Sequence, residues 1–312
     1  MYKSGRMQRS MLRAGLALLL AAAPAAAQEE PVSLTGIIDF HAHAGPDSRP
    51  RSLDDIEVAR LFREEGLRGM VLKNHFTMTA DRAALAMAQV DGLEIFGGVV
   101  LNRSVGGINP EAVRQMVAFE GGRGKVVWLP TWDAEFNEYR IRPDGSVAAP
   151  GPSDPFVRVL EDGAPVAPLV EILSLIAAHD LVLATGHLTP QEVMLLLPAA
   201  KAQGVRHILV THPFGQHATI DDMRRMAAEG AVMELDWFAV HRGSDSVAEY
   251  AEAIREVGAE HYLITSDLGQ AGNPTHTEGL RAFIRALRAA GVSDREVDLM
   301  ARRNPARLLG LD

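Results

Sequence analysis

The chain has 312 residues, a formal net charge of −9 at pH 7 and no cysteine. The negative charge and the lack of a basic stripe argue against nucleic acid as a partner, because nucleic-acid phosphates are bound by clustered lysine and arginine. Without cysteine there are no disulfides and no thiolate ligands, so any metal site must use histidine and carboxylate groups.

The first 27 residues are predicted to be a secretory signal peptide. Four basic residues between Lys3 and Arg13 precede an apolar run, Ala14–Ala23, and Ala25–Ala27 supplies the small side chains that signal peptidase requires. The apolar run is too short to span a bilayer, which takes about 20 residues. We therefore expect cleavage after Ala27, a periplasmic or secreted mature protein of residues 28–312, and no stable membrane insertion.

The rest of the chain alternates short apolar runs with amphipathic helical patterns. The runs are rich in Val, Ile and Leu, as in a parallel sheet that is buried on both faces. A strand followed by a helix, about eight times in this length, predicts a single-domain α/β protein, a (β/α)8 TIM barrel, rather than a doubly wound sheet. The predicted strands are Thr35–His41, Gly69–His75, Glu94–Leu101, Lys125–Thr131, Leu181–His187, His207–His212, Ala231–Trp237 and Tyr262–Asp267.

Helix beginnings and one long loop complete the predicted architecture. Ser52 with Asp55, and Thr189 with Glu192, have the spacing of capping boxes. Residues 133–168, after the fourth strand, are rich in Pro, Gly and Asp, with a turn signal at Asp162-Gly163. A loop of this length at the carboxyl face of the barrel is predicted to be a lid or a substrate-recognition hairpin.

Candidate metal ligands stand at the ends of several predicted strands. The first strand ends in Asp-Phe-His-Ala-His, and the alternation of strand side chains turns His41 and His43 to the same side. His187, His212 and Asp267 end the fifth, sixth and eighth strands. Barrel active sites are built at the carboxyl ends of the strands. His207 and His261, at the amino ends of their strands, are therefore assigned to the opposite face.

This order of residues resembles the amidohydrolase superfamily. Its pattern is HxH after the first strand, one histidine after each of the fifth and sixth, and an aspartate after the eighth. The run Asn304–Gly310 is similar to its final helix, and HAHAGPD, VLKNHF, VLNRSVGG and SDLGQAGNP resemble an uncharacterised amidohydrolase-like family. The resemblance covers nearly the whole mature chain. It implies a divalent metal held by His41, His43, His187, His212 and Asp267.

The fourth strand departs from the two-metal members of the superfamily. Those members carry a carboxylated lysine or a glutamate there, whereas Val126–Thr131 holds neither and Asp133 is the nearest carboxylate. Lys73 and His75, at the end of the second strand, could substitute. A buried neutral Lys73 could take up carbon dioxide and bridge two ions as a carbamate, or a charged Lys73 could hold a substrate anion. Structural roles for both residues are equally open.

Three further residues are candidates for substrate contact. Arg103 follows the third strand and could clamp a carboxylate or phosphate with its planar guanidinium group. His241 and His276 lie in loops after the seventh and eighth strands. The alternatives are a salt bridge in the loop for Arg103 and simple solvation for the two histidines.

The resemblance implies metal-assisted hydrolysis of an amide, lactone, ester or phosphoester of a small molecule. Asp267 would accept a proton from water, and His212 would bind a second metal or donate to the developing oxyanion. One alternative is a one-metal decarboxylase or hydratase of the same superfamily, and another is a metal-bearing protein that only binds a small molecule. Zinc suits the ligand set, as one or two ions, although manganese, iron and cobalt fit as well. The oligomeric state is not specified by the sequence.

Overall fold

The computed structural model describes Met1 and residues 32–136 and 156–311. The predicted signal peptide and residues 137–155 of the predicted lid lie outside the described residues. In the part of the chain that is described, no helix is both long enough and apolar enough to cross a membrane.

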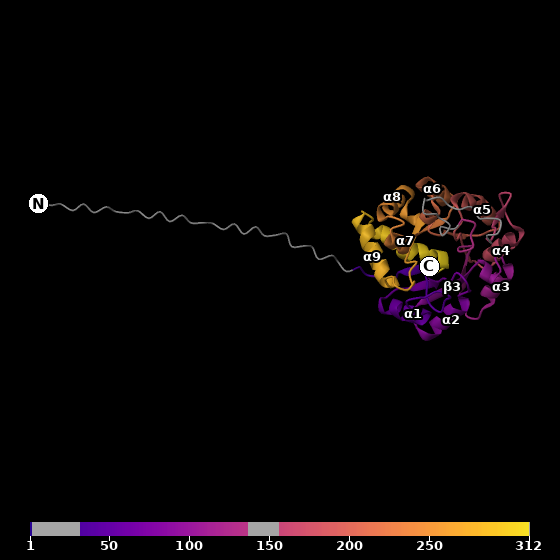
Figure 1. Ribbon diagram of the computed structural model, residues 1–312, viewed down its shortest axis with the longest axis horizontal. Helices are drawn as coiled ribbons and strands as arrows, with labels where there is room; N and C mark the ends of the chain where they lie inside the picture. The colour runs from indigo at the N-terminus through magenta and orange to yellow at the C-terminus, as the bar shows by residue number, and fades with distance from the viewer. Residues whose placement is uncertain (2–31, 137–155, 312) are drawn as a thin grey trace. The chain divides into compact units, whose positions relative to one another are not determined.

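Eight parallel strands form one sheet in the order β1-β2-β3-β4-β7-β8-β9-β10. A bridge between Ala42 and Leu268 joins the first strand to the end of the last, and helices surround the sheet (Figure 1). The predicted single-domain (β/α)8 barrel is therefore confirmed. The strands are β1 Ile38–Ala42, β2 Gly69–Leu72, β3 Glu94–Val100, β4 Gly124–Trp128, β7 Val182–Ala184, β8 His207–Val210, β9 Val232–Asp236 and β10 Tyr262–Thr265.

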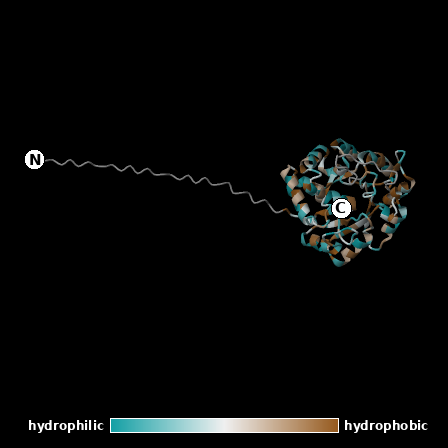
Figure 2. Ribbon diagram, viewed as in Figure 1, coloured by the Kyte–Doolittle hydropathy of each residue, from teal (hydrophilic) through white to brown (hydrophobic). Residues whose placement is uncertain are grey.

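Two apolar layers stabilise the barrel. The inner layer fills the interior of the barrel with side chains such as those of Phe40 and Trp128, and Leu308 of the last helix packs against them. The outer layer lies between the strands and the helices, which carry both hydrophilic and hydrophobic residues (Figure 2). The helices are α1 Asp55–Glu64, α2 Ala80–Gln89, α3 Pro110–Ala118, α4 Ala167–Ala178, α5 Pro190–Ala202, α6 Ile220–Ala228, α7 Trp237–Arg242, α8 Val247–Val257, α9 His276–Ala289, α10 Asp294–Asp298 and α11 Asn304–Leu309.

The helix beginnings differ from the prediction at one place. Thr189 and Glu192 form the expected capping box of α5. The prediction for α1 was wrong, because Asp54 is the N-cap and pairs with Glu57. Ser52 is engaged elsewhere, since its backbone N–H donates to the carbonyl oxygen of Gly269 at 3.0 Å. The loop after β1 is thus bound to the loop after β10 through Ser52, and Gly45 of the same loop accepts a hydrogen bond from the backbone N–H of Asp55 in α1 at 3.0 Å.

The described part of the predicted lid contains a small hairpin. Strands β5 (Leu160–Glu161) and β6 (Ala164–Pro165) are antiparallel and two residues long. Asp162 and Gly163 join them with φ values of 50° and 77°, as a tight two-residue turn with a glycine in second place requires. The turn signal in the sequence therefore marks a real hairpin.

Candidate metal centre

A cavity of about 240 Å³ opens at the carboxyl end of the strands. Its wall brings together side chains at or just beyond the ends of six barrel strands, β1, β2, β7, β8, β9 and β10. Active sites of barrel proteins are built at this end. The predicted residues on the wall are His41, His43, Lys73, His75, His187, His212 and Asp267.

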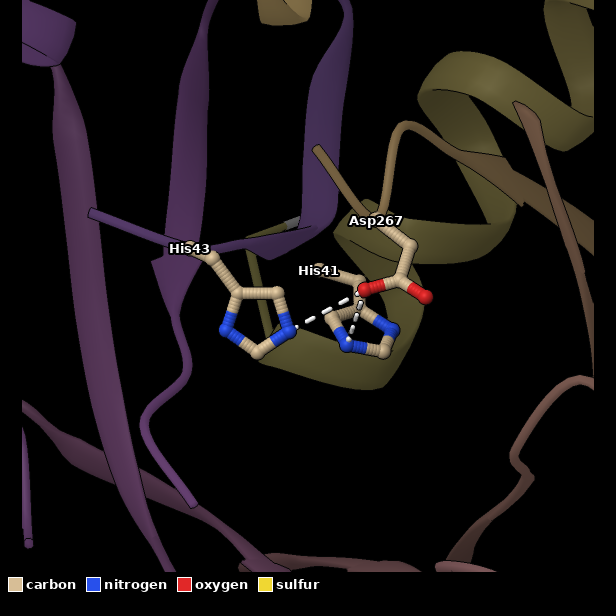
Figure 3. Close-up of side chains that lie close together, drawn as sticks. All are labelled: His41, His43 and Asp267. Carbon is tan, nitrogen blue, oxygen red and sulfur yellow. Dashed lines mark ion pairs between the residues drawn. The ribbon is translucent and has the colours of Figure 1, made fainter. Parts of the chain in front are cut away.

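Three of these residues form a tight cluster (Figure 3). His41, His43 and Asp267 each offer one ligand atom, and these atoms lie within 4.8 Å of one another. The Oδ1 atom of Asp267 is 3.0 Å from Nε2 of His41 and 3.1 Å from Nε2 of His43. Two imidazoles and one carboxylate are a donor set that zinc and similar divalent metals prefer.

The hydrogen bonds of His43 show that the cluster fits a cation. Its Nδ1 faces the carbonyl oxygen of Lys73 at 2.9 Å, so this nitrogen carries the ring proton. Burial lowers the pKa of His43 to about 3, which keeps the ring neutral. Nε2 therefore presents a lone pair to the Asp267 carboxylate. Two electron-rich atoms at this distance repel each other unless a cation lies between them, and a divalent metal meets that need.

His41 is oriented by a residue that the sequence analysis did not single out. Its Nδ1 lies 2.6 Å from Oε1 of Glu234, which is buried in β9 and also accepts a hydrogen bond from Oγ1 of Thr265 at 2.8 Å. Burial disfavours charge on His41, but attraction to Asp267 and Glu234 raises its pKa to about 9. Without a metal, a proton thus occupies the side of His41 that faces Asp267. In the sequence, Glu234 could have been identified as an acidic residue within an otherwise apolar strand.

His187 and His212 lie beside the cluster but outside the group of three. Their ring centroids are 5.0 Å apart, and the ring of His212 stacks on that of His41 at 6.0 Å. His212 has a φ of 25°, a backbone conformation that is strained for a residue with a side chain. Gly186 positions His187, since a Cβ there would lie 2.2 Å from the carbonyl oxygen of Leu129. Such strain is typical of residues held for function.

Lys73 and His75 both face the cavity from the end of β2. Lys73 is only 2% exposed, and its Nζ has no hydrogen-bond partner among the described residues. Burial lowers the pKa of Lys73. Nδ1 of His75 lies 2.9 Å from Oγ1 of Thr131, which follows β4. Asp133, in contrast, accepts a hydrogen bond from the backbone of Arg103 and is absent from the cavity wall.

The three predicted substrate contacts are not among the described residues that line the cavity. Arg103 is exposed and binds Asp133 through its backbone N–H. His241 is exposed at the end of α7. His276 is fully buried, and its Nε2 lies 3.0 Å from the carbonyl oxygen of His43. Its contact with the backbone behind the cluster gives it a positioning role and keeps its ring out of the cavity.

Several cavity residues were missed in the sequence. Asp236 ends β9 and accepts a hydrogen bond from the backbone of Ala239 at 2.7 Å, and burial together with the nearby Asp267 raises its pKa. Arginines and an aromatic side chain line the wall as well. No spacing rule pointed to them, because they lie in loops or, for Arg242, at the end of a short helix after a strand, where the sequence does not specify the course of the backbone. These residues are Arg49, Arg51, Trp132 and Arg242.

The cluster lies on the line where the barrel closes. Asp39 in β1 accepts hydrogen bonds from the backbone and the hydroxyl group of Ser266, after β10. The backbone N–H of Asp267 donates to the carbonyl oxygen of His41 at 3.0 Å, and that of His43 donates to Leu268 at 2.9 Å. These bonds determine how the metal-ligand side chains of the first and last strands face each other.

The protein is therefore a (β/α)8 barrel with a candidate metal centre at the carboxyl end of its strands. The chain belongs to DUF6282, a family of unknown function whose profile matches residues 36–234. No curated protein matches it in sequence.

Solved structures with the same fold include three that bear on the site. A 2,6-dihydroxybenzoate decarboxylase from Rhizobium is 14% identical, with a TM-score of 0.57 over 89% of this chain and 99% of that one. A protein assigned as 2-pyrone-4,6-dicarboxylic acid hydrolase from Pseudomonas putida is 16% identical, with a TM-score of 0.59 over 90% and 99%. A dihydroxybenzoic acid decarboxylase from a Polaromonas species, with bound manganese and an inhibitor, is 15% identical, with a TM-score of 0.56 over 89% and 97%.

These neighbours have the barrel fold that the resemblance to the amidohydrolase superfamily implies. The similarity is one of fold at these identities, and it includes both hydrolases and decarboxylases.

Proposed function

We propose that the protein is a metal-dependent hydrolase that acts on an amide, lactone, ester or phosphoester of a small molecule. The observation that carries this proposal is the convergence of His41, His43 and Asp267 on a buried point at the base of the cavity. His187 and His212 stand next to this point, as the ligand pattern of the superfamily requires. We further propose zinc as the metal and the periplasm or the cell exterior as the location.

The residues of the chain have distinct tasks in this proposal. His41, His43 and Asp267 would hold the metal, with His187 and His212 as further ligands. A divalent metal lowers the pKa of water and polarises a carbonyl or phosphoryl group. Asp267 would accept a proton from a water molecule in the cavity and return it to the leaving group. Its Oδ1 faces the two histidines, whereas Oδ2 has no hydrogen bond among the described residues and is free for this role.

Metal analysis tests the proposal directly. Residues 28–312 are purified without chelator, and metal per chain is measured by plasma mass spectrometry in wild type and in a His41→Ala/His43→Ala variant. We expect about one equivalent of metal in wild type and its loss in the variant. His261→Ala, at the opposite end of β10, is the matched control and should keep the metal. Wild type that holds no metal after reconstitution with zinc and manganese would overturn the proposal.

The metal count also decides the role of Lys73. The described residues contain one group of three ligands, which is enough for one ion. We therefore expect Lys73→Met to keep the metal of the wild type and to impair substrate binding. Two equivalents in wild type that fall to one in Lys73→Met would instead make Lys73 the bridge between two ions.

A decarboxylase with one metal is the second candidate function. The observation that favours it is the end of β4, where Val126–Thr131 contains no lysine or glutamate that could bridge two ions. Release of carbon dioxide from an aromatic or β-keto acid would select the decarboxylase. Turnover of esters, lactones, amides or phosphoesters would select the hydrolase. Asp267→Asn should abolish either reaction, and a metal-loaded protein with neither activity would be a binding protein.

A further inference from the structure

We propose that the mouth of the cavity binds a carboxylate of a planar small molecule through the guanidinium groups of Arg49 and Arg242. The inference rests on the proposed function in one respect, since it takes this cavity to be the substrate site. It replaces Arg103 as the expected anion contact.

Arg49 is an exposed residue at the cavity wall that stacks on aromatic side chains. It lies in the loop after β1, and its guanidinium carbon is 4.1 Å from the ring centroid of Trp132 and 5.8 Å from that of Phe76. A guanidinium group that stacks on a ring keeps its N–H bonds in the plane, where they can bind both oxygens of a carboxylate. Stacking thus prepares Arg49 for a planar anion before the ligand arrives.

Arg242 faces the same cavity from the other side of Asp267. It is the last residue of α7, the helix that follows β9, and its guanidinium carbon is 5.0 Å from the ring centroid of Phe238. In the sheet, β10 lies between β9 and β1. The backbone segments that carry Arg49 and Arg242 thus follow the strands on either side of β10, and both side chains line the cavity that contains Asp267. An anion bound in this cavity would lie close to the candidate metal centre.

The charges on the wall leave these two arginines without an acidic partner. Asp267 faces His41 and His43, Asp236 accepts from Ala239, and Asp245 accepts from the hydroxyl group of Tyr250 at 2.7 Å. Arg51 is bound by Asp47 at 2.7 Å. Neither Arg49 nor Arg242 forms an ion pair within the described residues. In a chain with 40 acidic and 31 basic residues, two such arginines at one cavity favour an anionic ligand.

The shape and the lining of the cavity narrow the class of anion. The ring centroid of Trp132 is 5.8 Å from that of His75 and 6.3 Å from that of Phe76, so one side of the wall is aromatic. A flat ring packs well against such a wall. A cavity of about 240 Å³ holds a molecule of roughly the size of a substituted ring. A planar ring acid meets these conditions better than a phosphate, whose oxygens are arranged as a tetrahedron.

Calorimetric titration tests this inference with defined probes. Benzoate, nicotinate, phthalate and inorganic phosphate are titrated into metal-loaded and into chelator-treated protein, with benzamide and nicotinamide as uncharged counterparts. We expect the carboxylates to bind in both forms and the amides to bind at least about tenfold more weakly, since a hydrogen bond to a charged group is stronger than one to a neutral group. Arg49→Ala and Arg242→Ala should each weaken carboxylate binding about tenfold. Arg60→Ala, on the exposed face of α1, is the matched control.

Other results of the titrations would overturn the anion site or separate it from the proposed function. Carboxylate binding that needs the metal and ignores both arginine variants would overturn the inference, as would equal binding of acids and amides, tighter binding of phosphate, or no binding at millimolar concentration. A chain that holds no metal, yet binds benzoate through Arg49 and Arg242, would contradict the proposed function and leave the anion site standing. Arg49→Lys, which keeps the charge but not the planar group, should recover only part of the affinity.

Discussion

Glu234 and His41 form a buried pair that determines which nitrogen of His41 faces the metal centre. Oε1 of Glu234 lies 2.6 Å from Nδ1 of His41, and the side chain of each is 1% exposed. A carboxylate in this position holds the imidazole in one tautomer and raises its basicity as a ligand. The pair joins β9 to β1 beneath the cluster, so the geometry of the site depends on a strand that contributes no residue to the group of three.

Substitution of Glu234 should therefore weaken metal binding without removing a ligand. We expect Glu234→Ala to raise the dissociation constant of the metal by about 10- to 100-fold, as is usual for such partners of metal-bound histidines. Competition with a chromophoric chelator measures this constant. Glu229 pairs with Lys201 far from the cluster and its side chain is 37% exposed, so Glu229→Gln is the control and should behave as wild type. Unchanged affinity in a folded Glu234→Ala protein would contradict the positioning role.

The ion pair between Asp55 and Arg82 should contribute more to stability than a surface pair. Arg82 donates to both oxygens of Asp55 at 2.7 and 2.8 Å and also to the carbonyl oxygen of Ala44, next to His43. Its side chain is only 12% exposed. Arg82→Met leaves a buried carboxylate without its partner, which costs about 3–5 kcal/mol. Urea unfolding followed by circular dichroism measures the loss.

The pair between Glu65 and Arg281 is the matched comparison, because its side chains are 31% and 27% exposed. Pairs of this kind contribute about 1 kcal/mol or less. Glu65→Gln should therefore change the free energy of unfolding much less than Arg82→Met does. Equal losses in the two variants would show that burial does not distinguish these pairs.

Gly269 is expected to be intolerant of any side chain. A Cβ at this position would lie 1.8 Å from the carbonyl oxygen of His43, and its φ is 120°. Gly269→Ala should displace the backbone of His43 and reduce both metal content and melting temperature. Gly272→Ala separates the two causes, since Gly272 has a φ of 91° but nothing within 4 Å of its Cβ position. It should cost only about 1–2 kcal/mol of backbone strain and keep the metal.

The predicted signal peptide gives an independent test outside the described residues. When the full chain is expressed in a bacterial host, the exported protein should begin at Gln28. Amino-terminal sequencing of the periplasmic fraction decides the matter. An exported protein that begins at Met1 would show that the segment is not cleaved.

The fold could be predicted because each strand is marked by a local pattern in the sequence. Eight runs of buried apolar residues, with capping residues such as Thr189 between them, identify the barrel without knowledge of any long-range contact. The strand ends were less accurate. β7 ends at Ala184 and β8 at Val210, so His187 and His212 stand in loops beyond the sheet. Their direction is determined by hydrogen bonds and glycines at the barrel mouth, which alternation along a strand does not describe.

The positions of the candidate site residues were also predicted in part. Candidate ligands at strand ends follow from the topology, and all seven of these residues line the cavity, although only His41, His43 and Asp267 form the group of three. Glu234 was missed because its partner His41 is 193 residues away in sequence, and nothing local pairs them. Arg103 and His276 were assigned to the cavity only from their place after a strand. The structure turns the first toward solvent and the second toward the barrel wall, since the side-chain direction in a loop depends on its backbone path.

Because the barrel closes between β1 and β10, the cluster can form only after the last strand has joined the sheet. The cluster takes two ligands from near the start of the folded chain and one from its last strand, Asp267. A nascent or truncated chain that ends before this strand carries the histidines but has no site. Metal bound by this cluster would therefore require the complete barrel, and the ion would link the first strand to the residues that follow the last one.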